Sequence, residues 1–431
     1  MRLGGVGVLE KMDMTIAAPR LADSTFWHQP LDARMIETAE IRELGAVLAV
    51  ESVSPLTELP ETFFALTRHA EVVEVSKRPT EFCSGQGATS MFDLPMEMLE
   101  FFGGFINMDN PRHSHQRRIV AAAFTPTQLR GVLESVETIC AEVIDSFCED
   151  GEADLVEVLS QPFPLLVICD MMGIPRSEFS TVLHATNVIL SGGDPEFMGD
   201  GGIGALIEAG VQLDALMKEL IEERRKHPTD DLTSRLVNHM HDEDLLTPAE
   251  ITSFFVLLAV AGNDTTRTAI SHGVDLLSRN PDQRAIWQAD IDGVSNTAVE
   301  EIVRAASPVT FMRRTATTDV ILGEHEFHAG DKVVMMYGAA NRDPRVFDDA
   351  ERFDVLRNPN PHVGFGGPGP HFCLGAHLAR RELAVVFREL HRRLPDLTVS
   401  GDVVPLQSAG IPLVTGIKHL PVSFTPSPRP G

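Results

Sequence analysis

Apolar residues recur at three- and four-residue spacing through most of the middle of the chain. This spacing forms one face of an α-helix, and it predicts helices over residues 128–147, 205–225 and 248–277. Short runs suited to strands lie toward the ends of the chain, at 62–66, 320–322, 332–337 and, interrupted by Gly and Pro, 397–424. The pattern therefore predicts a mainly α protein with small peripheral β-sheets.

Two short motifs predict where helices begin. Thr247-Pro248-Ala249-Glu250 has the form of a capping box with Pro at the first helical position, so we expect a helix that starts at Pro248. Thr297-Ala298-Val299-Glu300 is a second capping box, which predicts a helix that Pro308 stops. In the first helix the apolar stripe runs on toward Gly262 and Thr265, so we place both on its buried side.

No fixed-period repeat or linker-like change of composition divides the chain, so we expect one domain over residues 19–431 after a mobile N-terminal arm at 1–18. Residues 191–204 contain six glycines and predict a flexible connection, either a lid or a plain solvated loop. Residues 341–372 are dense in Pro, Gly, Asp and Asn, and irregular segments of that length are usually functional.

The composition restricts the partners and the compartment. The 36 Lys and Arg against 62 Asp and Glu give a formal net charge of −26 over 431 residues, which disfavours nucleic acid and anionic membranes as partners. The longest apolar run, 254–261, is too short for a transmembrane helix, and no signal-peptide pattern is present. The five unpatterned cysteines argue against a disulfide framework, so we expect a cytoplasmic protein.

Residues 364–375 place five glycines around one thiol, Cys373, just before a predicted helix at 376–387. A helix N-terminus favours the thiolate, the form that binds metal or attacks an electrophile. Four interpretations remain open. An inert buried cysteine leaves the glycines unexplained, and a zinc site lacks a second pair of ligands. A nucleophilic thiol could use His371 as its base, and an axial thiolate on a heme iron could be shielded by Phe365.

The stretch from Ala261 to Thr266 puts a glycine, a carboxylate and two hydroxyl groups into the middle of the predicted helix at 248–277. Each is intrinsically unfavourable there. Thr265 could donate a hydrogen bond back to the carbonyl of Ala261, which is a frequent and harmless arrangement. These residues taken alone do not decide between that structural role and a functional one.

The loop around Cys373 resembles the heme-binding signature of the cytochrome P450 superfamily, which reads Phe, two residues, Gly, three residues, Cys, one residue, Gly. Gly369, Cys373 and Gly375 match it, whereas Phe365 lies one position earlier than the pattern has it. The resemblance implies the P450 fold, heme b with its iron ligated by the Cys373 thiolate, O2 as co-substrate, and a monooxygenase activity. It implies a shielding role for Phe365.

The same resemblance assigns the polar stretch of the long helix. Residues 261–266 look like the family's distal-helix motif, in which Ala261 borders the heme and a groove at Gly262 accommodates dioxygen. By that likeness Asp264 relays protons and Thr265 holds a hydrogen-bonded water. Cleaving the O–O bond requires such delivery of protons in an otherwise dry pocket.

Further family elements fix a structural network and the heme carboxylates. Glu301 and Arg304 match a Glu-x-x-Arg element that forms a buried ion pair with a third cation, for which Arg352 is our first candidate and His362 the second. Basic residues at four positions resemble those that clamp the heme propionates: His113, Arg117, Arg314 and His371.

No flavin or nicotinamide motif is evident, so the resemblance implies electrons from a ferredoxin and a ferredoxin reductase with NAD(P)H. We expect a monomer that binds an acidic ferredoxin at a local basic island. The arginines of this island are Arg112, Arg117, Arg118, Arg380, Arg381, Arg388, Arg392 and Arg393.

Apolar side chains predict the substrate pocket, and we expect it to be lined by Phe254, Leu257, Leu258, Val309, Thr310 and Phe311. From about residue 60 onward the chain resembles mycobacterial-type P450s that hydroxylate methyl-branched lipids at the chain terminus, and relatives that oxidise sterol side chains. The segments that carry this likeness are 169–175, the distal helix through Arg267, 312–314 and 358–362.

Terminal hydroxylation of a branched isoprenoid, fatty or sterol-like molecule is the activity that this resemblance implies. Two alternatives stay open: a peroxide-driven heme enzyme, and a heme sensor or lipid carrier without turnover.

Overall fold

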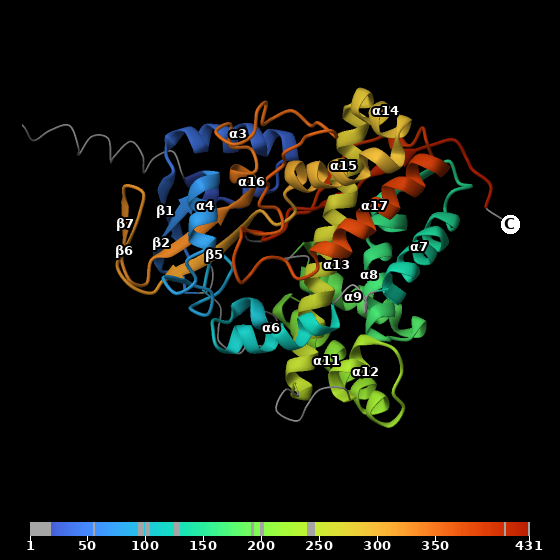
Figure 1. Cartoon of the computed structure of the whole chain (residues 1–431), viewed down its shortest axis with the longest axis horizontal. Helices are drawn as coiled ribbons and strands as arrows, with labels where there is room; N and C mark the ends of the chain where they lie inside the picture. The colour runs from blue at the N-terminus through green and yellow to red at the C-terminus, as the bar shows by residue number, and fades with distance from the viewer. Residues whose placement is uncertain are drawn as a thin grey trace, which may run out of the picture.

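The computed structural model describes residues 19–54, 57–93, 99, 104–124, 130–190, 194–198, 202–238, 246–408 and 411–429. Helices dominate these residues (Figure 1). They are α2 (Ser24–Trp27), α3 (Leu31–Leu44), α4 (His69–Ser76), α6 (Arg112–Ala123), α7 (Arg130–Asp145), α8 (Pro162–Met172), α9 (Phe179–Leu190), α10 (Pro195–Met198), α11 (Gly202–Lys226), α12 (Leu232–Asn238), α13 (Pro248–Arg279), α14 (Pro281–Ala289), α15 (Ile291–Ala306), α16 (Tyr337–Ala340) and α17 (Ala376–Arg393).

The strands form small sheets at the edge of the helical part, most of them on the left of Figure 1. The largest sheet has the order β1-β2-β8-β5-β3, and only its β2–β8 pair is parallel. Its strands are β1 (Val47–Val53), β2 (Pro60–Leu66), β3 (Phe82–Cys83), β5 (Phe311–Ala316) and β8 (Lys332–Met336). The smaller sheets pair β6 (Val320–Leu322) with β7 (His325–Phe327), β10 (Val404–Pro405) with β11 (Ile417–His419), and β12 (Pro421–Ser423) with β4 (Glu152–Asp154) and β9 (Thr398–Val399).

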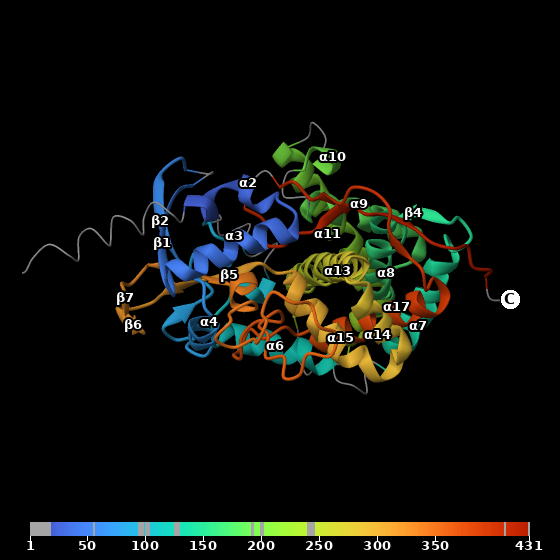
Figure 2. The ribbon, with the colours of Figure 1, turned by 90° about the horizontal axis from the view of Figure 1, so that it is seen from above.

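Helix α13 is the axis around which the helical part is packed. Figure 2 looks along it, and α8, α11, α15 and α17 lie around it. Its start follows from the capping box: the Thr247 side chain accepts a hydrogen bond from the Glu250 amide, and the Glu250 carboxylate accepts one from the Thr247 amide. At Gly273 a Cβ would collide with the ring of Phe387 in α17, so glycine lets the two helices approach closely.

The structure confirms the predicted mainly α class and most of the predicted elements. The periodic segments 128–147, 205–225 and 248–277 correspond to α7, α11 and α13. The predicted strand at 332–337 ends at Met336, because Tyr337 already belongs to α16. The run from 397 to 424 contains four short strands rather than one.

The capping box predicted at Thr297 is wrong. Helix α15 begins at Ile291, because the Asp290 side chain caps it by accepting a hydrogen bond from the Gly293 amide at 3.0 Å. Thr297 lies inside this helix and donates to the Val294 carbonyl at 3.0 Å. The predicted end is correct, since α15 stops at Ala306 before Pro308.

Two predicted segments fall wholly or mostly outside the described residues. These are the arm at 1–18 and the glycine-rich connection at 191–204, of which only 194–198 and the start of α11 are described. Within the described ranges, no helix is both long and apolar enough to cross a membrane. Cys83, Cys140, Cys148 and Cys169 are buried free thiols, and Cys373 is exposed.

Candidate active site

Residues of α13, of α17 and of the loop 364–375 line a cavity of about 220 Å³. Most of its wall is apolar. Besides the aliphatic residues of α13, the apolar lining includes Phe105, Ile106, Phe124, Phe254, Ile168, Pro308, Val309 and Met312. The polar side chains in the wall are those of Arg117, Thr265, Thr266, Arg314, Tyr337, His371, Cys373 and Glu382.

The glycines of the loop are explained by close packing and by space in the cavity. A Cβ at Gly369 would collide with the Ser76 carbonyl at the end of α4. Gly366 has φ +87°, a conformation that other residues rarely adopt. Gly375 lines the cavity and a Cβ there would meet nothing within 4 Å, so the loop leaves room for a ligand beside Cys373.

Cys373 lies directly before α17, as the sequence predicts, but its helix terminus does not make it a thiolate. Desolvation raises the pKa of the Cys373 thiol, and this outweighs the opposing hydrogen bond from the Gly375 amide and the charges of Arg117 and Arg380. An ionised sulfur at this place therefore needs a further positive charge beside it. A metal ion bound to the sulfur supplies that charge.

Basic side chains cluster beside the thiol. Arg117, Arg314 and His371 line the cavity, and the ring of His113 lies 4.1 Å from that of His371 between centroids. Desolvation, helped by the neighbouring guanidinium groups, lowers the pKa of His113 to about 4 and that of His371 to about 2. Both imidazoles are therefore neutral near pH 7.

This cluster lacks acidic partners among the described residues. Arg314 is buried and forms no ion pair there, its printed hydrogen bond going to the Arg313 carbonyl at 2.7 Å, and His113 Nε2 is buried without a partner. Two unmatched guanidinium groups and an unsatisfied imidazole beside a free thiol fit a ligand with two carboxylates and a metal centre. The residues predicted to hold a heme are thus brought together at one cavity.

The polar stretch of α13 divides between the cavity and the interior. Ala261, Gly262 and Thr265 line the cavity, and the Thr265 hydroxyl donates to the Ala261 carbonyl at 2.5 Å. Asp264 does not line the cavity: it is buried and pairs with Arg267 at 2.6 Å. Burial raises the pKa of Asp264 in spite of this cation.

A second buried acid, which the sequence analysis missed, lies on the cavity wall. Glu382 of α17 is 3% exposed and accepts a hydrogen bond from Thr266 at 3.3 Å. Desolvation raises the pKa of Glu382 to about 8. A signal was present in the sequence, because Glu382 follows Leu378 by four positions and precedes Val386 by four, on the apolar face of the helix.

The predicted substrate contacts are partly correct. Phe254, Leu257, Leu258 and Val309 line the cavity. Thr310 and Phe311 do not, and that part of the prediction is wrong.

The reason for this error is the alternation of side chains along an extended segment. Val309 faces the cavity, whereas Phe311 is fully buried in a second hydrophobic cluster, where its ring lies 5.7 Å from that of Trp27. The Thr310 hydroxyl bonds to the carbonyls of Pro412 and Leu413.

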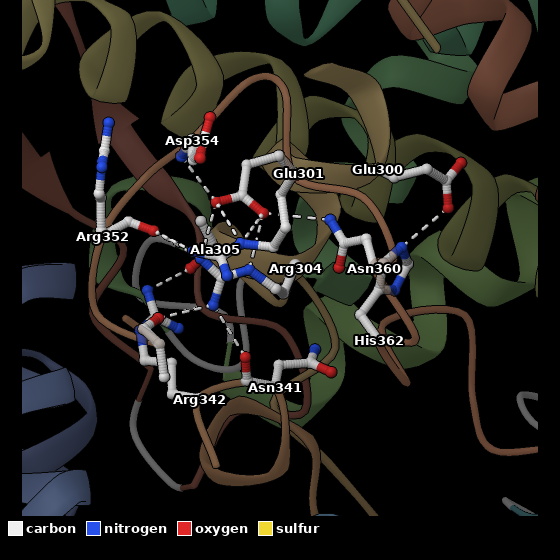
Figure 3. A network of polar contacts seen from close by, with 12 residues as sticks. Glu300, Glu301, Arg304, Ala305, Asn341, Arg342, Arg352, Asp354, Asn360 and His362 are labelled. Carbon is white, nitrogen blue, oxygen red and sulfur yellow. Dashed lines mark hydrogen bonds and ion pairs between the residues drawn. The ribbon is translucent and has the colours of Figure 1, made fainter. Parts of the chain in front are cut away.

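Glu301 and Arg304 form the predicted buried pair on α15 (Figure 3). Arg304 donates from Nε and Nη2 to the two Glu301 oxygens at 2.7 and 2.8 Å. It also donates to the carbonyls of Asn341, Ala350 and Arg352, which pins the long irregular segment before Cys373.

Neither predicted candidate is the third cation. Arg357 Nε lies 3.1 Å from a Glu301 oxygen and takes that place. Arg352 contributes only its carbonyl to the network, and its side chain is exposed. His362 instead contacts the neighbouring Glu300 at 2.9 Å, as Figure 3 shows.

Three comparisons place this geometry among known proteins. A sequence description of the family "Cytochrome P450" matches residues 203–394. The chain is 43% identical over 421 residues to a methyl-branched lipid omega-hydroxylase of Mycobacterium tuberculosis, covering 96% of each chain. It is 35% identical to a steroid C26-monooxygenase of Mycolicibacterium smegmatis, covering 84% of each.

Solved structures agree. A cytochrome P450 of Mycobacterium marinum in complex with pseudoionone superposes with a TM-score of 0.87 at 41% identity, covering 94% of this chain and 98% of that one. A protein of Novosphingobium aromaticivorans superposes with a TM-score of 0.81 at 28% identity, covering 95% and 98%.

The network around Glu301 generates a prediction that separates Arg357 from Arg352. Replacing Arg357 by Met removes a cation whose side chain is only 10% exposed from a fully buried carboxylate, so we expect a loss of roughly 3 kcal/mol in the free energy of unfolding. Urea unfolding followed by circular dichroism measures it.

The matched control is Arg352→Ala, which leaves the backbone carbonyl in place. Its expected loss is under about 0.5 kcal/mol, as for other exposed side chains. Equal losses in the two variants would contradict the assignment of Arg357.

Proposed function

The chain belongs to the cytochrome P450 family, and from this premise we propose that it hydroxylates a lipophilic, methyl-branched substrate at or near the chain terminus, with electrons from a ferredoxin. The enzyme is a P450 monooxygenase with a cysteine-ligated heme and O2 as co-substrate. Similar proteins are named for omega-hydroxylation of methyl-branched lipids and for oxidation of steroids at C26. Both names describe attack near the end of a branched chain.

The residues beside the cavity would hold the heme from two directions. Cys373 would ligate the iron, and Arg314, Arg117, His113 and His371 would bind the two propionates. When bound, the heme supplies the activation of O2 and the insertion of one oxygen atom into a C–H bond. The remaining steps, which position the substrate, exclude water and move protons, fall to the protein's own side chains.

The apolar wall of the cavity carries the proposal for the substrate. Phe254, Leu257 and Leu258 extend along α13 away from Thr265, and Phe105 and Phe124 pack beside Phe254 at ring-centroid distances of 6.3 and 6.5 Å. These side chains offer apolar contact and no hydrogen bond. They favour a long apolar molecule whose hydrocarbon end, rather than a polar group, comes to lie beside Thr265.

Thr265 and Asp264 are our candidates for handling protons. The Thr265 hydroxyl donates its proton to the Ala261 carbonyl, so its lone pairs are free to accept a hydrogen bond from a water in the cavity. Burial raises the pKa of Asp264, which helps this carboxyl to hold and pass a proton. Asp264 pairs with Arg267 in this structure, so delivery requires the carboxyl to turn away from that cation.

The electron partner that we propose is an acidic ferredoxin, but the structure narrows the surface for it. Much of the predicted basic island is neutralised within the protein: Arg381 pairs with Glu137, Arg393 with Asp145 and Arg392 with Asp292. Arg112 and Arg118 are exposed on α6, whose Arg117 donates to the carbonyl of Phe372 next to Cys373. We therefore assign docking chiefly to α6.

The substrate proposal predicts binding and regiochemistry together. Methyl-branched fatty acids, isoprenoids and sterols should displace the water on the ferric heme and give products hydroxylated at the terminal carbon, identified by mass spectrometry. A linear acid of the same length is the matched control, and we expect at least several-fold weaker binding. Hydroxylation only in the middle of the chain would contradict the proposal.

The partner and the activity need separate readouts. Full product formation from hydrogen peroxide without any electron donor would instead favour a peroxide-driven enzyme. Ligand binding without any turnover would favour a sensor or carrier.

The proton-handling role predicts that Thr265→Ala uncouples the reaction. We expect NAD(P)H consumption to continue while product per NAD(P)H falls several-fold and hydrogen peroxide appears. Thr268→Ala is the control, because Thr268 lies one turn further along α13, does not line the cavity and has a buried hydroxyl with no partner in the described structure. A fully coupled Thr265→Ala enzyme would remove this assignment.

The docking surface predicts a salt-dependent effect of charge. Arg112→Glu and Arg118→Glu should slow reduction by the ferredoxin several-fold at low ionic strength and flatten its dependence on salt. Stopped-flow reduction measures both. Arg225→Glu reverses an exposed charge on α11 and should leave the rate unchanged, and an unaltered salt dependence in the α6 variants would exclude this surface.

A further inference from the structure

Phe365 lies beside Cys373 in spite of an unusual spacing in the sequence. Three residues separate it from Gly369, one more than in the family's signature. The Phe365 carbonyl nevertheless accepts a hydrogen bond from the Cys373 amide at 2.9 Å, and its side chain lines the same cavity as the thiol. Something must therefore hold this ring in place while the loop absorbs the extra residue.

The backbone absorbs the extra residue on the side away from the ring. Gly366, at φ +87°, turns the chain directly after Phe365, and its amide bonds to the Val363 carbonyl at 2.8 Å. Gly367 and Gly369 then pack against Ser76, where a Cβ on either would collide. These contacts fix the backbone of the loop but leave the Phe365 ring to be positioned by other side chains.

One cation lies directly over the ring. The guanidinium carbon of Arg380, on the first turns of α17, is 4.3 Å from the centroid of Phe365. Arg380 is also one of the two guanidinium groups whose charge favours the ionised sulfur of Cys373 by lowering its pKa against the effect of desolvation. The same side chain therefore contacts the ring and acts on the sulfur.

Arg380 is itself held on two sides. Its Nε and Nη2 donate to the two oxygens of Glu300 on α15, the second at 2.9 Å. Glu300 also bonds to His362 at 2.9 Å, and His362 Nδ1 accepts from the Gly364 amide at 3.1 Å, so this chain of contacts returns to the loop itself (Figure 3). Although burial opposes it, the hydrogen bonds from Arg380 and His362 lower the pKa of Glu300 to about 2.

We propose that Arg380, held by Glu300, is a positioning residue for Phe365 that keeps the ring against the Cys373 sulfur and sets the electron density of the heme-ligating thiolate. An exposed Arg–Glu pair would contribute little. This pair differs because the planar guanidinium engages a carboxylate through two nitrogens and an aromatic face at the same time, a geometry that lysine cannot reproduce. The inference concerns the ligation of the heme and does not depend on the substrate or on the electron donor.

The test compares three variants without any redox partner. The readouts are the midpoint potential of the heme iron by spectroelectrochemistry, and the rate at which the ferrous carbonyl complex loses its thiolate-type absorption. For Arg380→Gln we expect a more negative potential, because a positive charge near the iron stabilises the reduced form, and a several-fold faster spectral conversion, because the ring is released.

Two further variants separate charge from position. Arg380→Lys keeps the charge but loses the stacking and the paired hydrogen bonds, so it should restore the potential and not the rate. Arg381→Gln removes a charge from the adjacent position, whose partner is Glu137, and should match the parent in both partner-free measurements. If Arg380→Gln loses heme on purification, Arg380→Lys carries the test through the conversion rate alone.

A double variant shows whether Arg380 acts through the ring. In a Phe365→Leu background, Arg380→Gln should no longer change the conversion rate, since the stacked partner is already absent. The proposal is overturned if Arg380→Gln equals Arg381→Gln in both readouts, or if its effect on the rate is undiminished without Phe365.

Discussion

The architecture of this site depends on the difficulty of keeping one sulfur ionised inside a protein. Desolvation alone would leave Cys373 a neutral thiol, even with the Gly375 amide and two arginines near it. The heme iron supplies the missing positive charge. The sulfur in turn requires a rigid loop, because a metal ligand must stay in place, and the Glu301–Arg304 pair pins the segment that leads into this loop.

The features that could be predicted from the sequence are those whose cause is local. The capping box at Thr247 fixes the start of α13, and helical spacing alone makes Glu301 and Arg304 neighbours. The glycine-rich loop next to a predicted helix places Cys373 correctly. Arg357 could not be found in this way, because its distance from Glu301 along the chain is bridged by a loop without periodicity, and Arg352 is equally basic.

The errors share a second cause, which is that one residue type can satisfy two environments. Thr297 fits a capping motif, but the Asp290 side chain caps the same helix one turn and more upstream and prevails. Val309, Thr310 and Phe311 are all suited to a pocket wall, yet an extended backbone can turn only alternate side chains toward the cavity. The Glu382 carboxyl was overlooked for the opposite reason, since an acid on an apolar face is rare.

The charges around the cavity explain how one space can take both a dianionic cofactor and an apolar substrate. Its two nearby acids are silenced in different ways: Asp264 is turned to Arg267, and burial raises the pKa of Glu382 to about 8, so that Glu382 is mostly protonated near pH 7. Arg314 and Arg117 therefore remain as unmatched cations on one side. The heme propionates neutralise them, and once they do so the part of the cavity left to the substrate carries almost no charge, which is the condition for binding a hydrocarbon chain.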